Sequence, residues 1–176
     1  MPLPVIRARR ILLRPWTRED TDELLELWTA PEVRRYLWDD SVITRQTAVQ
    51  LVDSHLAAVE NHGIGFWVLH VPPEDERIAG FCGFRLIDNG PEIELMYGLR
   101  GEHWHQGLAT EARAAALEYL WRSTSCERVY ARTDPPNRRS VKVIERLGMR
   151  HESTAPATVT YLLQRAEPCP DHKLNL

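Results

Sequence analysis

The sequence predicts one mixed α/β domain built around a single sheet. Its 176 residues suit one domain with a core of ordinary size. Apolar residues recur at helical spacing in some stretches and alternate with polar residues in others, as in amphipathic helices and half-buried strands. The resulting order is strand, helices, three strands, helix, strand, helix and strand. This mixture is typical of one sheet covered by helices.

The first third of the chain predicts a short strand followed by helices. Residues 11–16 form the strand, and Thr17 is a suitable N-cap for the helix that follows. Pro31 begins a second, short helix. Thr44 can cap a third helix, which Gly63 ends because glycine readily takes the left-handed conformation after a last helical turn.

The middle of the chain predicts three consecutive strands. They span residues 65–71, 77–87 and 92–99, where β-branched and aromatic residues are frequent. The segments that join them, 72–75 and 88–91, are rich in Pro, Gly, Asp and Asn and therefore predict turns. The three strands are expected to form an antiparallel meander.

The last third predicts a helix after Gly107, on which Arg113 is expected to face away from the core. A strand over 128–133, a helix over 138–147 and a strand over 159–163 follow it. Residues 166–176 contain two prolines and little apolar periodicity, so they predict a C-terminal tail. No interior linker is evident, which favours a single domain over residues 1–165.

Composition narrows the expected partners and compartment. The formal net charge is −3, which gives no reason to expect the concentrated basic region typical of nucleic-acid binding. No apolar run approaches membrane-spanning length, and the N-terminus lacks the layout of a signal peptide. Three scattered cysteines indicate a reducing compartment rather than a disulfide framework. We therefore expect a cytoplasmic protein that binds neither nucleic acid nor membrane.

The most informative segment joins the strand at 92–99 to the next helix. It contains the sequence Trp-His-Gln-Gly-Leu-Ala over residues 104–109. The first N–H groups of a helix have no internal partners, and together with the helix dipole they form an anion site that suits phosphates. Gly107 would let a ligand approach the backbone closely. An ordinary strand-to-helix turn is the competing interpretation.

This segment resembles the acyl-CoA site of the GNAT superfamily of N-acetyltransferases, whose pyrophosphate loop is usually Gln/Arg-x-x-Gly-x-Gly/Ala. It is most similar to the RimJ/RimL group, in which the loop often begins with Trp, as at Trp104. There the loop continues into Ala-Thr-Glu-Ala, as at residues 109–112. His105 stands where that group usually has Gly, so the loop is expected to take a different path or to bring an imidazole near the phosphates.

Two further segments carry the resemblance, in the family's order. Residues 9–20 are similar to the first strand and helix of the RimJ/RimL group. Asn137 and Ser140 match its Asn-x-x-Ser motif, and the later Leu-Gly-Phe appears with Met149 in place of Phe. The resemblance covers roughly residues 6 to 165. It implies the GNAT fold: a single mixed, mostly antiparallel central sheet flanked by helices and split at the cofactor-binding strand.

The resemblance also implies that acetyl-CoA is the acyl donor. The residues expected to contact it are Tyr97, Leu99, Trp104, His105, Gln106, Gly107, Leu108, Ala109, Thr110, Asn137 and Ser140. The loop and the helix start would hold the pyrophosphate, and the free edge of the strand ending at Leu99 would pair with the pantetheine arm. Asn137 is equally suited to capping the helix that follows it.

Catalysis in this family implies direct attack by the acceptor amine, with a base to remove its proton and an acid to protonate the thiolate. Glu94 is at the family's position for a strand glutamate and is the candidate base, with Glu92 on the same side of the strand as a rival. A solvated strand face, which would account for at least one of the two glutamates, is the alternative. Ser140 is the candidate acid, with Tyr97 and Tyr161 as rivals. Ser140 could instead complete the start of its helix.

The sequence says less about the acceptor substrate than about the acyl donor. Tyr36 and Trp38 stand beside Asp39 and Asp40, and aromatic rings next to carboxylates suit a protonated amine. A core position for Trp38 is the alternative. The group resemblance suggests the N-terminal α-amine of a protein. A small-molecule amine, such as an antibiotic or amino acid, and a non-catalytic acyl-CoA-binding module are the competing hypotheses.

Two further expectations concern metals and assembly. His103 and His105 flank Trp104, but no acidic or cysteine residue shows ligand spacing beside them, so no metal is expected. Dimers are common among relatives of this group. A homodimer would be expected to form through an edge strand near the C-terminus.

Overall fold

A computed structural model describes residues 2–72, 77–88 and 90–165 of the chain. Its strands are β1 (Ile6–Arg7), β2 (Leu12–Pro15), β3 (Phe66–His70), β4 (Gly80–Leu86), β5 (Ile93–Leu99), β6 (Arg128–Thr133), β7 (Arg150–Ala155) and β8 (Thr158–Gln164). Its helices are α1 (Thr21–Thr29), α2 (Pro31–Leu37), α3 (Arg45–His62), α4 (Leu108–Ser123) and α5 (Arg138–Arg146). Short 3-10 helices, η1 (Arg18–Asp20) and η2 (Gly101–His103), precede α1 and α4.

The strands form one sheet in the order β1-β2-β3-β4-β5-β6-β8-β7. Every neighbouring pair is antiparallel except β5 and β6, which are parallel. These two strands pair only at Ile93 with Val129 and Glu94 with Tyr130, and then diverge. The rest of β5 therefore has a free edge toward β6. This opening, which we call the split, confirms the predicted fold class.

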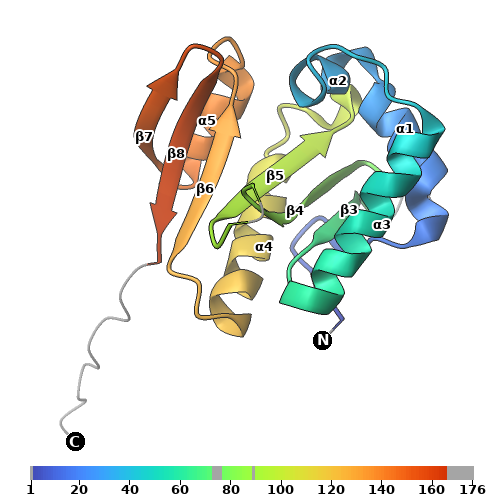
Figure 1. Cartoon of the computed structure of the whole chain (residues 1–176), viewed down its shortest axis with the longest axis horizontal. Helices are drawn as coiled ribbons and strands as arrows, with labels where there is room; N and C mark the ends of the chain where they lie inside the picture. The colour runs from blue at the N-terminus through green and yellow to red at the C-terminus, as the bar shows by residue number, and fades with distance from the viewer. Residues whose placement is uncertain (1, 73–76, 89, 166–176) are drawn as a thin grey trace, which may run out of the picture.

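Helices cover both faces of the sheet, with α1 and α3 on one face and α4 on the other (Figure 1). The larger core packs α4 residues such as Leu108 and Ala112 against inward side chains of β4 and β5. A second core packs α1 and α3 against the opposite face, where Phe66 and Phe81 are buried. The larger core also includes Val129 of β6, so it packs strands from both sides of the split against α4.

Local sequence signals explain where the helices begin and end. The Thr44 hydroxyl accepts a 3.2 Å hydrogen bond from the Thr47 N–H and caps α3. Gly63 ends α3 at a φ of +67°, where glycine is favoured. Asp20 accepts hydrogen bonds from the Thr17 N–H and from Arg14, and so closes the turn before α1.

Two strands were not predicted. β1 has only two residues, and all six residues of β7 are exposed, so neither shows the alternation that marks a half-buried strand. β7 lies at the sheet edge and pairs only with β8. Parts of the predicted turns (residues 73–76 and 89) and the predicted tail at 166–176 lie outside the described residues. None of the described helices is long and apolar enough to cross a membrane.

Candidate active site

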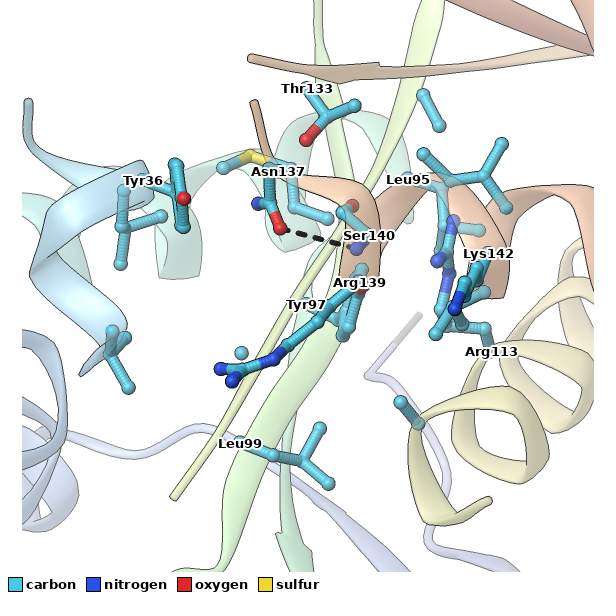
Figure 2. Close-up of a pocket in the computed structure, with 18 of the residues that line it drawn as sticks. Tyr36, Leu95, Tyr97, Leu99, Arg113, Thr133, Asn137, Arg139, Ser140 and Lys142 are labelled. Carbon is cyan, nitrogen blue, oxygen red and sulfur yellow. Dashed lines mark hydrogen bonds between the residues drawn. The ribbon is translucent and has the colours of Figure 1, made fainter. Parts of the chain in front are cut away.

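A cavity of about 590 Å³ lies at the split, between α2 on one side and β6 with α5 on the other. In Figure 2, Tyr36 lies on one side, Asn137 and Ser140 on the other, and Tyr97 below them. All but one of the predicted site residues line it: Tyr36, Trp38, Glu94, Tyr97, Leu99, Trp104, His105, Gly107, Leu108, Ala109, Thr110, Asn137 and Ser140.

Gln106 is the exception. Its side chain is exposed and donates a 2.9 Å hydrogen bond to the Glu102 carbonyl. Gln106 can therefore meet a ligand in the cavity only through its backbone. Tyr161, a sequence-based rival for the acid, is buried in a small core with Ile144 and does not line the cavity either.

The start of α4 has the unpaired backbone donors that the predicted anion site requires. The first intrahelical bond runs from the Glu111 N–H to the Gly107 carbonyl at 3.1 Å. The N–H groups of Leu108, Ala109 and Thr110 precede it and have no partner within the described chain. Gly107 has a φ of +78°, and a Cβ there would displace whatever approaches these donors. Unpaired N–H donors and little crowding beside Gly107 suit the binding of a diphosphate.

Cations line the cavity beside this helix start. Arg138, Arg139 and Lys142 belong to the first turns of α5 and lie along one wall. The Arg139 guanidinium stacks over the Trp104 ring, 4.4 Å from its centroid, and so joins the loop to α5 across the split. These positive charges would stabilise the phosphates of a nucleotide-linked ligand.

Arg10 also contacts this site, although no role was predicted for it from the sequence. Its Nη1 donates to the Gln106 carbonyl at 2.7 Å, and its Nε bonds the Glu111 carboxylate at 2.8 Å. Its Nη2 would lie 3.5 Å from a Cβ on Gly107. Arg10 thus ties the loop between β1 and β2 to the start of α4 and places a guanidinium beside the anion site.

His105 adopts the left-handed conformation that the usual glycine would take, with a φ of +62°. The loop therefore follows the path a glycine would allow, at a cost of about 1 kcal/mol for a residue with a Cβ. His105→Gly is expected to raise the free energy of unfolding by up to about 1 kcal/mol in urea denaturation, because it relieves this strain. A lower free energy of unfolding would contradict the assignment of strain.

Glu94 is buried, with its side chain only 3% exposed, so the solvated-face alternative is wrong. Its Oε1 accepts from the Arg132 Nε at 2.9 Å. Its Oε2 accepts from the Arg85 Nε at 2.7 Å and the Arg132 Nη2 at 3.1 Å. Three charge-assisted hydrogen bonds thus occupy most of the four lone-pair sites of this carboxylate. The base role of Glu94 stays a prediction.

Asn137 and Ser140 lie at the start of α5. The Asn137 Oδ1 accepts a 3.2 Å hydrogen bond from the Ser140 N–H, so Asn137 caps the helix as the competing interpretation expected. Its amide nitrogen stays available to the cavity. The Ser140 side chain is buried against the cavity, and its hydroxyl makes no hydrogen bond within the described residues.

Arg113 corrects a sequence-based expectation, because its side chain is fully buried rather than turned away. It stacks on the Tyr97 ring at 4.3 Å and reaches the Met149 sulfur at 3.9 Å. Its Nε and Nη1 have no partner within the described chain, and burial lowers its pKa. α4 packs on the sheet at this point, so Arg113 lies against Tyr97 of β5 rather than in solvent. Arg113 therefore places a positive charge beneath the split.

The side of the cavity that contains the predicted acceptor residues is formed by α2 and the end of β6. Tyr36 and Trp38 both line it, and Trp38 also packs edge-on against Trp28, with ring centroids 6.2 Å apart. Trp38 thus packs partly into the second core, as the alternative expected, while its acceptor role stays a prediction. The indole N–H of Trp38 has no partner within the described residues. Asp134, which follows β6, contributes a carboxylate that sequence analysis did not single out.

A split sheet beside an anion-binding helix start defines an acyltransferase of the GNAT type. The chain matches the family described as "Acetyltransferase (GNAT) domain" over residues 10–150, and it belongs to that family. It is 29% identical over 156 residues to the uncharacterized N-acetyltransferase p20 of Bacillus licheniformis. That alignment covers 85% of this chain and 84% of the relative.

Solved structures share the fold. An acetyltransferase from Agrobacterium tumefaciens superposes with a TM-score of 0.81 at 21% identity, covering 94% of this chain and 96% of the other. RimL, a ribosomal L7/L12 alpha-N-protein acetyltransferase in complex with coenzyme A, superposes with a TM-score of 0.78 at 15% identity, covering 92% and 98%. The predicted likeness to the RimJ/RimL group is therefore confirmed.

Proposed function

We propose that this protein transfers an acetyl group from acetyl-CoA directly to a primary amine. One observation carries the proposal: the unpaired N–H groups of α4 and the free edge of β5 open into the same cavity. A diphosphate-linked pantetheine needs both features, a cradle for its phosphates and a strand edge for its amides. The family membership and the coenzyme A bound to RimL support this donor.

Acetyl-CoA supplies an activated acyl carbon and a thiolate leaving group. The backbone N–H groups from His105 to Thr110 hold the pyrophosphate, and the backbone edge of β5 beyond Leu95 orients the arm. The Asn137 amide contacts that arm, while the Ser140 hydroxyl is placed to give a proton to the sulfur. By its family position, Glu94 is the carboxylate expected to take the proton from the amine.

The acceptor we propose is the N-terminal α-amine of a protein. RimL acts on such an amine, which supports this choice. An α-amine has a pKa near 8, roughly two units below that of lysine, so a carboxylate can deprotonate it more easily. Tyr36 and Trp38 would form the surface that receives the acceptor. Small amines and a purely acyl-CoA-binding role are the alternatives that the experiment below separates.

The test is thiol release from acetyl-CoA with purified protein and a panel of acceptors. The panel contains short peptides with free N-termini, the same peptides with blocked N-termini and internal lysines, and small amines. Release that requires the free N-terminus is the expected result. Release with small amines alone would favour the small-molecule alternative. Tight acetyl-CoA binding in calorimetry without release by any acceptor would overturn the enzymatic proposal.

A further inference from the structure

Three carboxylates of the described chain line the cavity: those of Glu32, Glu94 and Asp134. A base for the acceptor amine must have a lone pair free for the proton. Glu94 accepts three hydrogen bonds from two guanidinium groups, so protonating it would remove the negative charge that holds both of them. Glu32 is exposed on α2. Because Glu32 lies at the surface, water competes with its carboxylate for the proton of the amine.

Asp134 differs from both. It is half-buried, and its carboxylate makes no hydrogen bond or ion pair within the described residues. It directly follows β6, at the end of the strand that borders the split. It also precedes the Asn137 cap and Ser140 on the same wall of the cavity. Figure 2 shows the neighbouring Thr133 above Asn137 and Ser140, with Tyr36 of α2 to one side.

We infer that Asp134, rather than Glu94, takes the proton from the acceptor amine. The inference rests on the proposed function and identifies a catalytic residue for it. In its ammonium form the acceptor has three protons on nitrogen, and the amide product keeps one. Asp134 accepts one of the two that leave and passes it to water, while the other ends on sulfur. The nitrogen lone pair forms the C–N bond as the C–S bond breaks, so atoms and charge balance.

The surroundings of Asp134 suit proton transfer. Burial and, secondarily, the negative charge of Asp39 on the loop after α2 raise its pKa. No arginine, lysine or histidine among the described residues pairs with it, so no cation holds its charged form. Arg132, two residues earlier on β6, is already engaged by Glu94. A carboxylate with no paired cation can take up a proton without giving up an ion pair.

Glu94 then takes a different role. It neutralises Arg85 and Arg132, which project from the strands on either side of it. These two ion pairs link β4, β5 and β6 along the wall of the cavity. Glu94 is thus a positioning residue, and its loss should reduce the rate without moving the proton acceptor.

The deciding experiment compares Asp134→Asn with Glu94→Gln and with a control, Asp53→Asn, which alters a partly exposed carboxylate on α3 that pairs with Arg18 away from the cavity. The readouts are the pH profile of kcat/KM with the preferred amine and the acetyl-CoA affinity by calorimetry. Asp134→Asn is expected to lower kcat/KM on the order of 10²- to 10⁴-fold. The remaining rate should rise only as the amine itself loses its proton, and acetyl-CoA affinity should stay within about two-fold, since no donor contact is lost.

Glu94→Gln is expected to lower the height of the profile but keep its shape. A wild-type profile for Asp134→Asn, together with a lost acid limb for Glu94→Gln, would overturn the inference and assign the proton to Glu94. A wild-type protein that releases no thiol with any acceptor is a distinct result, because it defeats the proposed function itself. Thermal melting of each variant identifies losses that come from misfolding.

Discussion

Replacing Arg10 with methionine is expected to raise the KM for acetyl-CoA by about 10- to 100-fold, with a smaller change in kcat. Arg10 fixes the backbone before α4 through the Gln106 carbonyl and the Glu111 carboxylate. Hydrogen bonds that involve a charged group contribute about 1.5–3 kcal/mol each, and 1.4 kcal/mol changes an equilibrium constant tenfold. Loss of this support, and of a guanidinium beside Gly107, weakens the anion site directly.

The control for this prediction is Arg9→Met, because Arg9 is exposed and makes no side-chain hydrogen bond or ion pair within the described chain. It removes the same charge one residue away and should leave KM within about two-fold of wild type, as a screened surface charge does. Initial-rate kinetics at several salt concentrations would separate the two. If Arg9→Met and Arg10→Met raise KM equally, general charge rather than the Arg10 contacts supports binding.

Lowering the pH from 7 to 4 is expected to cost up to roughly 3 kcal/mol of folding stability through one histidine. His55 of α3 packs against the rings of Trp16 and Phe66, with ring centroids 4.9 and 4.4 Å away. Burial, aided by the positive charge of Arg85, lowers the pKa of His55 from 6.5 to about 4. The unfolded chain binds this proton below pH 6.5, whereas the folded chain binds it only near pH 4.

The direction in which pH changes the folding stability follows from this difference in proton binding between the folded and unfolded chain. Between pH 4 and 6.5 the unfolded state holds more protons, so stability is complete above pH 6.5 and falls as the pH decreases. His55→Phe keeps an aromatic ring in the core and removes the titration, so its free energy of unfolding should vary less across this range. His62→Gln, at the exposed end of the same helix, should behave as wild type. Urea denaturation at several pH values tests this, and an unchanged slope for His55→Phe would contradict it.

Several site residues could be predicted because their signals are local. The unpaired N–H groups at residues 108–110 belong to any helix that begins after Gly107. The Asn137 cap depends on a residue only three positions away. Both are properties of short stretches of chain, and the family motifs fall on those stretches. The donor side of the cavity was therefore recognisable before its geometry was known.

Other site residues could not be predicted because their partners are distant in sequence. Arg10 reaches Glu111 across 101 positions, and Arg132 reaches Glu94 across 38. Helical periodicity placed Arg113 outside the core, yet that side of α4 packs on the sheet, where Arg113 is buried beside Tyr97 of β5. Likewise, β7 has six exposed residues, so its pairing with β8 leaves no alternating pattern.

The sequence by itself determined the order of the helices and of six of the eight described strands, the start of α4 and membership of the family, because these depend on neighbouring residues and turn chemistry. Only the tertiary structure decided which charges are paired. It joined Glu94 to two arginines, buried Arg113 without full pairing and left Asp134 free at the cavity. The physical reason is that the state of a charged group depends on burial and nearby charges, and folding brings these together from separate strands.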